Sequence, residues 1–284
     1  MLKEYLKLIR VKNGILFVVA IMVGGYVYEV ELMKILVIAL LFFCGLSQAN
    51  VFNDVFDIQT DRINRPNRPL SSGKVSLRSA KRLGVILTLG FVLFSSFLGI
   101  EYMISAILVT ILNRLYTPIM KPRVFMGNIY VSLMLASPFV LYAILSVEKP
   151  IVGYYLCVGT FLLMIAREIL KDVEDIDGDK VVGMKTLPIV FGKDNAVFVS
   201  IIPLVNLGMV TVFFTYLAYL SGVNTTFLSL FILFGLFCLL CVSFTYLKYY
   251  TERRQRYISM LSLSMKILSI PLMAITPLFK IFGF

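Results

Sequence analysis

Two stripes of acidic and amide side chains are the residues in this sequence best suited to chemistry. The first consists of Asn50, Asn53, Asp54, Asp57 and Asp61, and the second of Glu168, Asp172, Asp175 and Asp179. The acidic members of each stripe recur at helical spacing, so a helix would place them on one face. Carboxylates crowded on one face repel each other unless a cation lies among them. Mg²⁺ prefers oxygen ligands and bridges carboxylates to phosphates, so the stripes predict a diphosphate held through Mg²⁺.

The segments after the two stripes are also alike. Pro69-Leu70 and Gly73-Lys74 come after the first stripe, much as Leu187-Pro188 and Gly192-Lys193 come after the second. This similarity predicts an internal repeat. The two copies lie four predicted membrane spans apart, and an even number of spans gives them the same orientation. We therefore expect the stripes to face each other across a helical bundle at the same depth.

Basic side chains close to each stripe would contact phosphate oxygens. Prolines stiffen the segment after the first stripe, which carries Arg65 and Arg68. Planar guanidinium groups bind phosphate through two parallel hydrogen bonds, so we expect this pair to hold an anionic substrate. Lys185 occupies the equivalent place after the second stripe. Tyr116 and Lys121 lie in another predicted loop on the same side of the membrane, where they would contact a leaving diphosphate.

The composition assigns the chain to the membrane proteins. Hydrophobic residues make up 59% of its 284 residues, whereas soluble globular domains contain about 45–50%. The sequence has no histidine, which excludes a Ser-His-Asp or Cys-His active site. All four cysteines lie in apolar runs, and one CxxC pair without histidine is a weak zinc signal. We expect a single transmembrane domain over residues 1–284, with the first apolar run retained as a span.

The elements that would position the stripes are nine transmembrane helices. Apolar runs of about 20 residues are long enough to cross a bilayer. Such runs lie at 14–28, 33–52, 84–100, 102–120, 124–147, 151–169, 197–220, 227–247 and 258–279. With the N-terminus in the cytoplasm and the C-terminus outside, most of the 27 Lys and Arg residues fall in inside loops, as the positive-inside rule expects. The net charge of +11 therefore indicates membrane topology and anionic headgroups, and not nucleic-acid binding.

Two other classes of membrane protein also carry acidic residues. A cation transporter would place carboxylates along an ion path. Here they gather at span ends on one side, while Glu101 and Glu148 lie on the far side. A CDP-alcohol phosphotransferase is Mg²⁺-dependent and rich in aspartate. The run Asp175-Ile-Asp177-Gly178-Asp179 has some likeness to its motif, but the Ala-Arg pair expected soon afterwards is missing.

Three motifs, in order along the chain and each at an inside span end, resemble those of the UbiA superfamily of intramembrane prenyltransferases. The NDxxDxxxD motif is matched by Asn53, Asp54, Asp57 and Asp61, the second DxxxD motif by Asp175 and Asp179, and the YxxxxK loop by Tyr116 and Lys121. The resemblance implies an all-α polytopic membrane protein with nine transmembrane helices around a central cavity. It also implies Mg²⁺ at both aspartate motifs and a lateral opening through which prenyl chains enter from the lipid.

These motifs and the residues near them give an expected division of roles. The expected ligands of Mg²⁺ are Asn53, Asp57, Asp61, Asp175 and Asp179. The four aspartates of that set form the expected catalytic group with Lys121, which would stabilise charge on the departing diphosphate. Asn13 matches a position that family members use near the active site. The residues expected to bind substrate are Asn13, Asn50, Asp54, Arg65, Arg68, Tyr116, Lys121, Asp172 and Lys185.

Within the superfamily, the run from Asp61 to Gly73, Asp-Arg-Ile-Asn-Arg-Pro-Asn-Arg-Pro-Leu-Ser-Ser-Gly, most resembles the archaeal digeranylgeranylglyceryl phosphate synthases. Those enzymes join geranylgeranyl diphosphate to geranylgeranylglyceryl phosphate and so form the second ether bond of archaeal lipids. Chlorophyll synthases and some aromatic prenyltransferases carry related sequences, so an aromatic or chlorophyll-type acceptor stays open. We expect a multi-pass protein of the cell membrane with a cytoplasmic active site and no obligatory protein partner.

Overall fold

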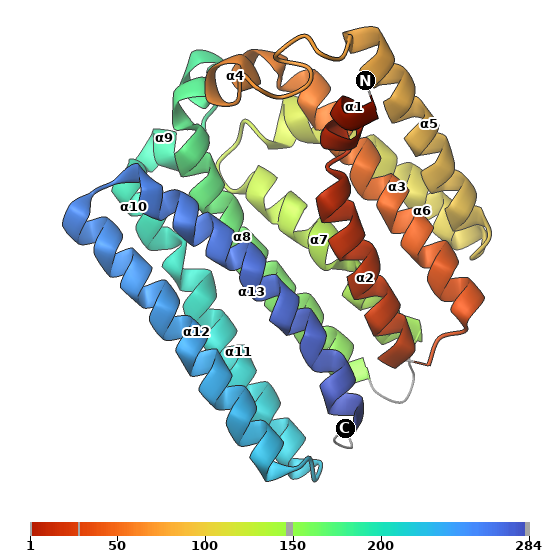
Figure 1. Ribbon diagram of the computed structural model, residues 1–284, viewed down its shortest axis with the longest axis vertical. Coiled ribbons are helices and arrows are strands. Elements are labelled where there is room, and N and C mark those ends of the chain that lie inside the picture. The colour runs from red at the N-terminus through yellow and green to blue at the C-terminus, as the bar shows by residue number, and fades with distance from the viewer. Residues whose placement is uncertain (1, 28, 146–149, 282–284) are drawn as a thin grey trace. The chain divides into compact units, whose positions relative to one another are not determined.

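The computed structural model describes residues 2–27, 29–145 and 150–281, and its regular structure in these ranges is entirely helical (Figure 1). The predicted all-α fold class is confirmed. The long helices are α2 (Val11–Val27), α3 (Leu32–Phe56), α5 (Leu77–Ser96), α6 (Ile100–Leu115), α7 (Met126–Leu145), α8 (Pro150–Val181), α11 (Ile201–Leu220), α12 (Thr225–Glu252) and α13 (Gln255–Ile281). The short elements are α1 (Leu2–Leu8), α4 (Ile58–Asn64), the π-helix η1 (Tyr116–Met120), α9 (Leu187–Phe191) and α10 (Lys193–Val199).

Each predicted span overlaps one of the long helices. The stretches of the described chain that are long and apolar enough to cross a bilayer are Leu32–Phe56, Ile100–Met120, Val152–Val181, Lys193–Leu220 and Phe231–Glu252. Two shorter apolar helices cover Val11–Tyr26 and Met126–Val140. Glu148 and the last residues of the predicted span at 124–147 lie outside the described residues. The chain is therefore a multi-pass membrane protein, and the count of nine spans stays a prediction.

Helix α5 begins earlier than the predicted span at 84–100. Ser76 caps it, because its side chain accepts a hydrogen bond of 3.1 Å from the backbone N–H of Ser79. The first turns of α5 carry basic residues, so hydropathy alone left them out of the span. At the other end the chain turns at Gly99, whose φ of 142° is a conformation that favours glycine.

The described residues form two compact units that alternate along the chain. The first comprises the N-terminal residues up to Gly25, Val30–Gly127 and Asp175–Thr186. The second comprises Tyr26–Glu29, Asn128–Glu174 and the residues from Leu187 onward. One boundary falls inside α8, so the second acidic stripe contributes two members to each unit.

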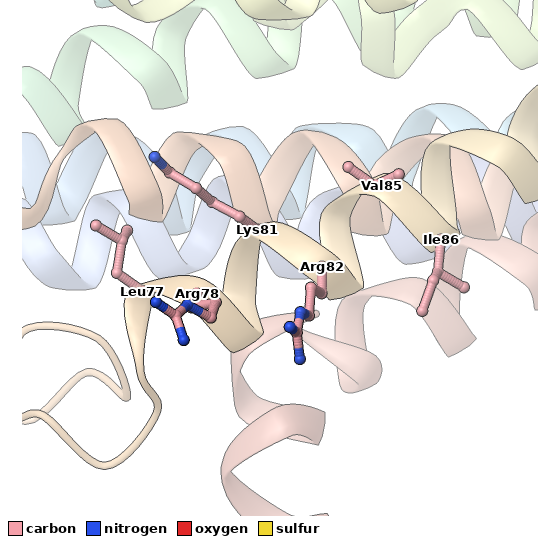
Figure 2. A pocket seen from close by; sticks show the side chains of 6 residues that line it. All are labelled: Leu77, Arg78, Lys81, Arg82, Val85 and Ile86. Carbon is pink, nitrogen blue, oxygen red and sulfur yellow. The ribbon is translucent and has the colours of Figure 1, made fainter.

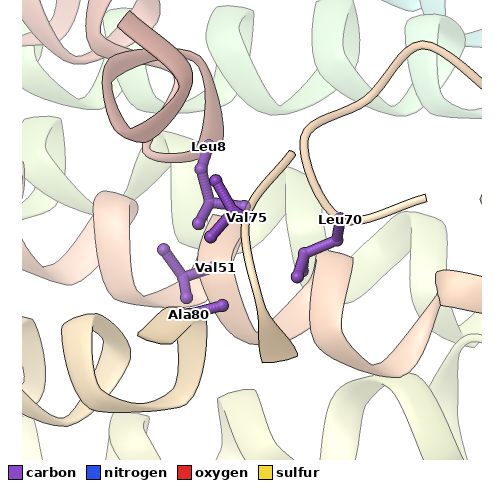
Figure 3. Close-up of a cluster of buried hydrophobic side chains, with 5 residues drawn as sticks. All are labelled: Leu8, Val51, Leu70, Val75 and Ala80. Atoms are coloured by element: carbon purple, nitrogen blue, oxygen red, sulfur yellow. The ribbon is translucent and has the colours of Figure 1, made fainter. Parts of the chain in front are cut away.

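Two clusters of buried apolar side chains stabilise the first unit. One joins α3, α5 and α6 and consists of Leu41, Phe91 and Ala106. The other joins α1, the end of α3, the loop after α4 and the start of α5, and consists of Leu8, Val51, Leu70, Val75 and Ala80 (Figure 3). Leu70 and Val75 lie in the loop that carries the predicted phosphate-binding arginines. Their burial therefore fixes that loop against the acidic end of α3.

Aromatic and hydroxyl contacts join the helices of the second unit. Tyr155 of α8 stacks on Phe214 of α11, with 4.2 Å between ring centroids. The Tyr155 hydroxyl lies 3.1 Å from that of Thr211, also on α11. The hydroxyls of Ser200 and Tyr246 lie 2.8 Å apart and are buried, so each provides the hydrogen-bond partner that a buried polar group requires.

Candidate active site

The first acidic stripe lies at the junction of α3 and α4. Asp57 ends α3 and begins α4, and its backbone angles, φ −85° and ψ 10°, interrupt the continuous helix that the spacing predicted. The backbone hydrogen bonds continue across the junction. The Asp57 N–H donates to the Asn53 carbonyl at 2.8 Å, and the Asp61 N–H donates to the Asp57 carbonyl at 2.7 Å. The stripe therefore keeps one face, and its buried members are Asn50, Asp54, Asp57 and Asp61.

Two arginines neutralise carboxylates of the first stripe. Arg68 donates hydrogen bonds of 2.6 Å to Asp61 and 3.1 Å to Asp54. Arg10 donates hydrogen bonds of 2.8 Å to Asp54 and to the amide oxygen of Asn50. Arg10 has a φ of 53°, a left-handed conformation that costs energy for a residue other than glycine. Sequence reasoning did not identify Arg10 as a partner of the stripe.

Lys121 pairs with the central carboxylate of the first stripe. Its ammonium donates to Oδ2 of Asp57 at 2.5 Å. The backbone N–H of Lys121 donates to the carbonyl of Tyr116 at 2.8 Å, which closes the wide turn of η1. The Thr117 hydroxyl donates to Oδ1 of Asn53 at 3.3 Å. The YxxxxK loop is thus held to the first aspartate motif by two side-chain contacts.

The loop after the first stripe reaches the second stripe within the first unit. Arg65 forms a two-pronged ion pair with Asp175, in which Nη1 lies 2.7 Å from Oδ2 and Nη2 lies 2.7 Å from Oδ1. The side chain of Asn64 donates to the Asp175 carbonyl at 2.8 Å and accepts from the Gly178 N–H at 2.9 Å. Sequence reasoning did not identify Asn64. The only signal was its amide side chain, directly before Arg65.

Gly178→Ala is expected to disrupt this connection. A Cβ at position 178 would lie 2.5 Å from the side-chain nitrogen of Asn64 and 2.8 Å from its oxygen. Asn64 cannot retreat without losing both hydrogen bonds to α8, and crowding of this kind costs about 1–3 kcal/mol. We expect a lower melting temperature by circular dichroism and slower turnover. Gly235→Ala is the matched control, since a Cβ there has no neighbour within 4 Å. Equal melting temperatures of the two variants would contradict the tight contact.

The remaining members of the second stripe have different surroundings. Asp179 is 1% exposed and lies in the first unit. Asp172 lies in the second unit, where it accepts a hydrogen bond of 2.8 Å from the side chain of Asn128. Glu168 forms ion pairs with Arg167 and Lys171. Sequence reasoning missed Asn128, because its distance from Asp172 along the chain gives no signal of a contact.

Two predicted substrate-binding residues are connected to the site by backbone hydrogen bonds. The N–H of Lys185 donates to the Pro122 carbonyl at 2.9 Å, directly after Lys121, and the Lys185 side chain is exposed. Asn13 is half-buried at the start of α2, and its N–H donates to the Arg10 carbonyl at 2.8 Å. The backbone of Asn13 is therefore bonded to a residue that holds an aspartate, and the backbone of Lys185 to the neighbour of such a residue.

The charge of the first stripe depends on nearby cations. Burial raises the pKa of the Asp61 carboxyl above its ordinary value. The positive charge of Arg68 and its hydrogen bond oppose this shift, whereas the charges of Asp54 and Asp57 add to it. A cation among these carboxylates therefore favours their ionised form.

The donor atoms of the first stripe fit a hard cation by type. Oδ1 of Asp57 is buried and has no hydrogen-bond partner among the described residues. A buried carboxylate oxygen without a partner is costly, and a divalent cation would satisfy it. Over the described ranges, no three His, Cys, Asp or Glu side chains are gathered as a metal site would require. Three of the predicted ligands of Mg²⁺, Asp57, Asp61 and Asp175, are instead paired with the predicted phosphate-binding cations Lys121, Arg68 and Arg65.

Known proteins are similar to this chain in sequence. Residues 14–270 match the sequence model of the UbiA prenyltransferase family. Digeranylgeranylglyceryl phosphate synthase from Pyrococcus abyssi is 34% identical over 225 residues, which cover 78% of this chain and 79% of that protein. The enzyme of the same name from Methanocaldococcus jannaschii is 35% identical over 203 residues, which cover 70% of this chain and 71% of that protein.

Solved structures share the fold. A structure reported for digeranylgeranylglyceryl phosphate synthase in membranes has a TM-score of 0.71 and 28% identity, and the match covers 99% of this chain and 98% of that one. A homologue from Archaeoglobus fulgidus bound to DMAPP and Mg²⁺ has a TM-score of 0.67 and 18% identity, with 96% and 99% covered. The likeness to both extends over nearly the whole of each chain.

Proposed function

The chain belongs to the UbiA prenyltransferase family, and from this premise we propose that it transfers a geranylgeranyl group from geranylgeranyl diphosphate to geranylgeranylglyceryl phosphate. The free hydroxyl of the acceptor would receive the group, and the product would carry the second ether bond of archaeal membrane lipids. The observation that carries this proposal is 34% identity to a digeranylgeranylglyceryl phosphate synthase over 78% of the chain. The site agrees with it, because buried carboxylates and arginines lie together there.

We propose that the ligands of Mg²⁺ are Asn53, Asp57, Asp61, Asp175 and Asp179. The solved homologue from Archaeoglobus fulgidus is bound to both DMAPP and Mg²⁺, which supports the choice of metal. Mg²⁺ bound here would neutralise the diphosphate and stabilise its departure. We also propose that Asn13, Asn50, Asp54 and Asp172 bind substrate.

The basic residues would contact the diphosphate and the phosphate of the acceptor. Lys121 would stabilise the negative charge that develops on the leaving group. Arg65 and Arg68 would bind phosphate oxygens once their present aspartate partners hold metal, with Tyr116 and Lys185 as further contacts. The bond between the allylic carbon and the diphosphate oxygen breaks, and the carbon becomes cationic. The acceptor hydroxyl oxygen then attacks this carbon, forms the ether bond and releases its proton.

The proposal includes a location in the cell membrane. The distribution of Lys and Arg supports a cytoplasmic N-terminus, a cytoplasmic active site and an outside C-terminus. The bilayer would supply both prenyl substrates. We propose that residues 1–284 form one transmembrane domain that functions without nucleic acid or an obligatory protein partner.

A labelled-substrate assay tests the function. The purified chain in detergent receives labelled geranylgeranyl diphosphate with geranylgeranylglyceryl phosphate, an aromatic acid or a chlorophyllide, each with Mg²⁺ or with a chelator. We expect product only with geranylgeranylglyceryl phosphate, and a loss of about a hundredfold or more on chelation, because the metal supplies several kcal/mol of charge stabilisation. Product that forms only with the aromatic acid would show that the acceptor is an aromatic acid and not geranylgeranylglyceryl phosphate. Diphosphate release that no acceptor increases would contradict prenyl transfer.

A further inference from the structure

A shallow, open groove with a volume of about 790 Å³ lies along the first half of α5. The side chains that line it are Leu77, Arg78, Lys81, Arg82, Val85 and Ile86 (Figure 2). They form two neighbouring rows, because residues four apart on a helix lie above one another. Lys81 and Val85 belong to the row that begins at Leu77, and Arg82 and Ile86 to the row that begins at Arg78 (Figure 2). The row of Arg78 thus changes from basic to apolar along the helix, and the row of Leu77 carries Lys81 between two apolar residues.

The basic end of the groove carries charge without a counter-ion from the chain. Arg78, Lys81 and Arg82 are exposed, and none of them forms an ion pair over the described ranges. The sequence contains no Asp or Glu between Asp61 and Glu101. Like charges one turn apart on a helix repel each other. The cations that contact the first unit's aspartates, Arg10, Arg65, Arg68 and Lys121, are paired, whereas Arg78, Lys81 and Arg82 remain available to attract an anion from outside.

The apolar end of the groove limits the chemical class of the anion that binds there. Val85 is 50% exposed and Ile86 is 64% exposed, and Leu89 continues the apolar surface one turn further on at 65%. A free phosphate or a nucleic acid would leave this surface uncovered. A membrane lipid with a phosphate headgroup covers both ends, because its phosphate faces the cations while its hydrocarbon chain lies along the helix.

We infer that this groove binds a membrane lipid whose headgroup carries an anionic phosphate. The phosphate lies against Arg78, Lys81 and Arg82, and one hydrocarbon chain lies along Val85 and Ile86. The guanidinium groups donate paired hydrogen bonds to phosphate oxygens, which a headgroup without negative charge accepts more weakly. This lipid is a structural ligand of the protein and binds at the membrane surface. Its site shares no residue with the candidate active site.

Lipid retention measures this binding directly. The full chain is placed in phosphatidylcholine nanodiscs that contain phosphatidylglycerol, released into detergent and analysed by native mass spectrometry. The variant Arg78→Gln/Lys81→Gln/Arg82→Gln is expected to retain phosphatidylglycerol roughly a hundredfold less than the unmodified chain, because each cation near an anionic lipid contributes separately. Turnover with detergent-solubilised substrates should stay unchanged, since these residues do not contact the aspartates.

Two further variants distinguish a specific lipid-binding site from nonspecific attraction by surface charge. Lys3→Gln/Lys12→Gln/Lys193→Gln removes the same charge from exposed lysines elsewhere and should keep the lipid. Val85→Ser/Ile86→Ser keeps the charge and should lose lipid while still binding inorganic phosphate.

Equal lipid loss in both charge variants would overturn the site. So would full retention by the Arg78/Lys81/Arg82 variant, or competition by inorganic phosphate as strong as that by phosphatidylglycerol. Nucleic acid that copurifies with the unmodified chain and disappears with the groove variant, with no change in lipid, would overturn it as well.

Discussion

Replacing Asp57 with alanine is expected to lower turnover by about a thousandfold or more, the scale on which a lost electrostatic contact to the reacting groups is felt. Asp57 is 4% exposed, lies at the junction of α3 and α4, and uses only one of its carboxylate oxygens to pair with Lys121. The other oxygen is the buried one without a partner among the described residues. The measurement is the initial rate of labelled ether product at saturating Mg²⁺.

Two variants make the Asp57 result specific. Asp57→Asn keeps the shape and a hydrogen bond to Lys121 while removing the charge, so a similar loss of rate with an unchanged circular dichroism melt excludes misfolding as the cause. Asp177→Ala removes an exposed carboxylate from the second acidic segment and should stay active. Full activity of Asp57→Ala would remove this residue from the proposed ligands of Mg²⁺, and the same standard applies to Asp175→Ala.

Arg68→Met is expected to destabilise the protein in the absence of Mg²⁺ and to make Mg²⁺ strongly stabilising. Arg68 neutralises Asp54 and Asp61, which are each 3% exposed. The substitution leaves the buried Asp61 without its partner and Asp54 with Arg10 alone, and a buried charge without its partner costs about 3–5 kcal/mol. Mg²⁺ would restore much of this loss, because a ligand that binds only the folded state raises its stability. Since the chain has no tryptophan, the melt is followed by circular dichroism with and without Mg²⁺.

Arg62→Met is the control for this prediction. Arg62 is an exposed arginine on α4, close to Arg68 along the chain. Its loss should leave both the melting temperature and the effect of Mg²⁺ nearly unchanged. If Mg²⁺ raised the melting temperatures of both variants equally, Arg68 would not compete with the metal for carboxylates.

The sequence predicted much of the fold and the residue types of the site. Long apolar runs and helical spacing are local properties, so the long helices and the buried face of the first stripe were predictable from them. The start of α5 was not, because a hydropathy pattern does not register the cap at Ser76. The break at Asp57 was also missed, since the spacing of the stripe is the same with or without it.

The pairing of side chains was the part that sequence could not supply. Arg65, Arg68 and Lys121 were expected to face phosphate, and the structure pairs them with Asp175, Asp61 and Asp57. Both a phosphate and a carboxylate can pair with Arg or Lys, and only the tertiary arrangement decides which of them does. Arg10 and Asn64 illustrate the same limit, because their partners lie 44 and 111 residues away along the chain.

The π-helix η1 has a consequence for the evolution of chain length. A π turn accommodates one residue more than an α turn, so η1 behaves as a single-residue insertion at the end of α6. Deleting that residue would restore ordinary helical geometry and rotate the next part of the chain by about 100° around the axis. Lys121 would then leave Asp57. Exposed connections generally tolerate insertions and deletions, whereas at this point a change of one residue would separate the YxxxxK loop from the first aspartate motif.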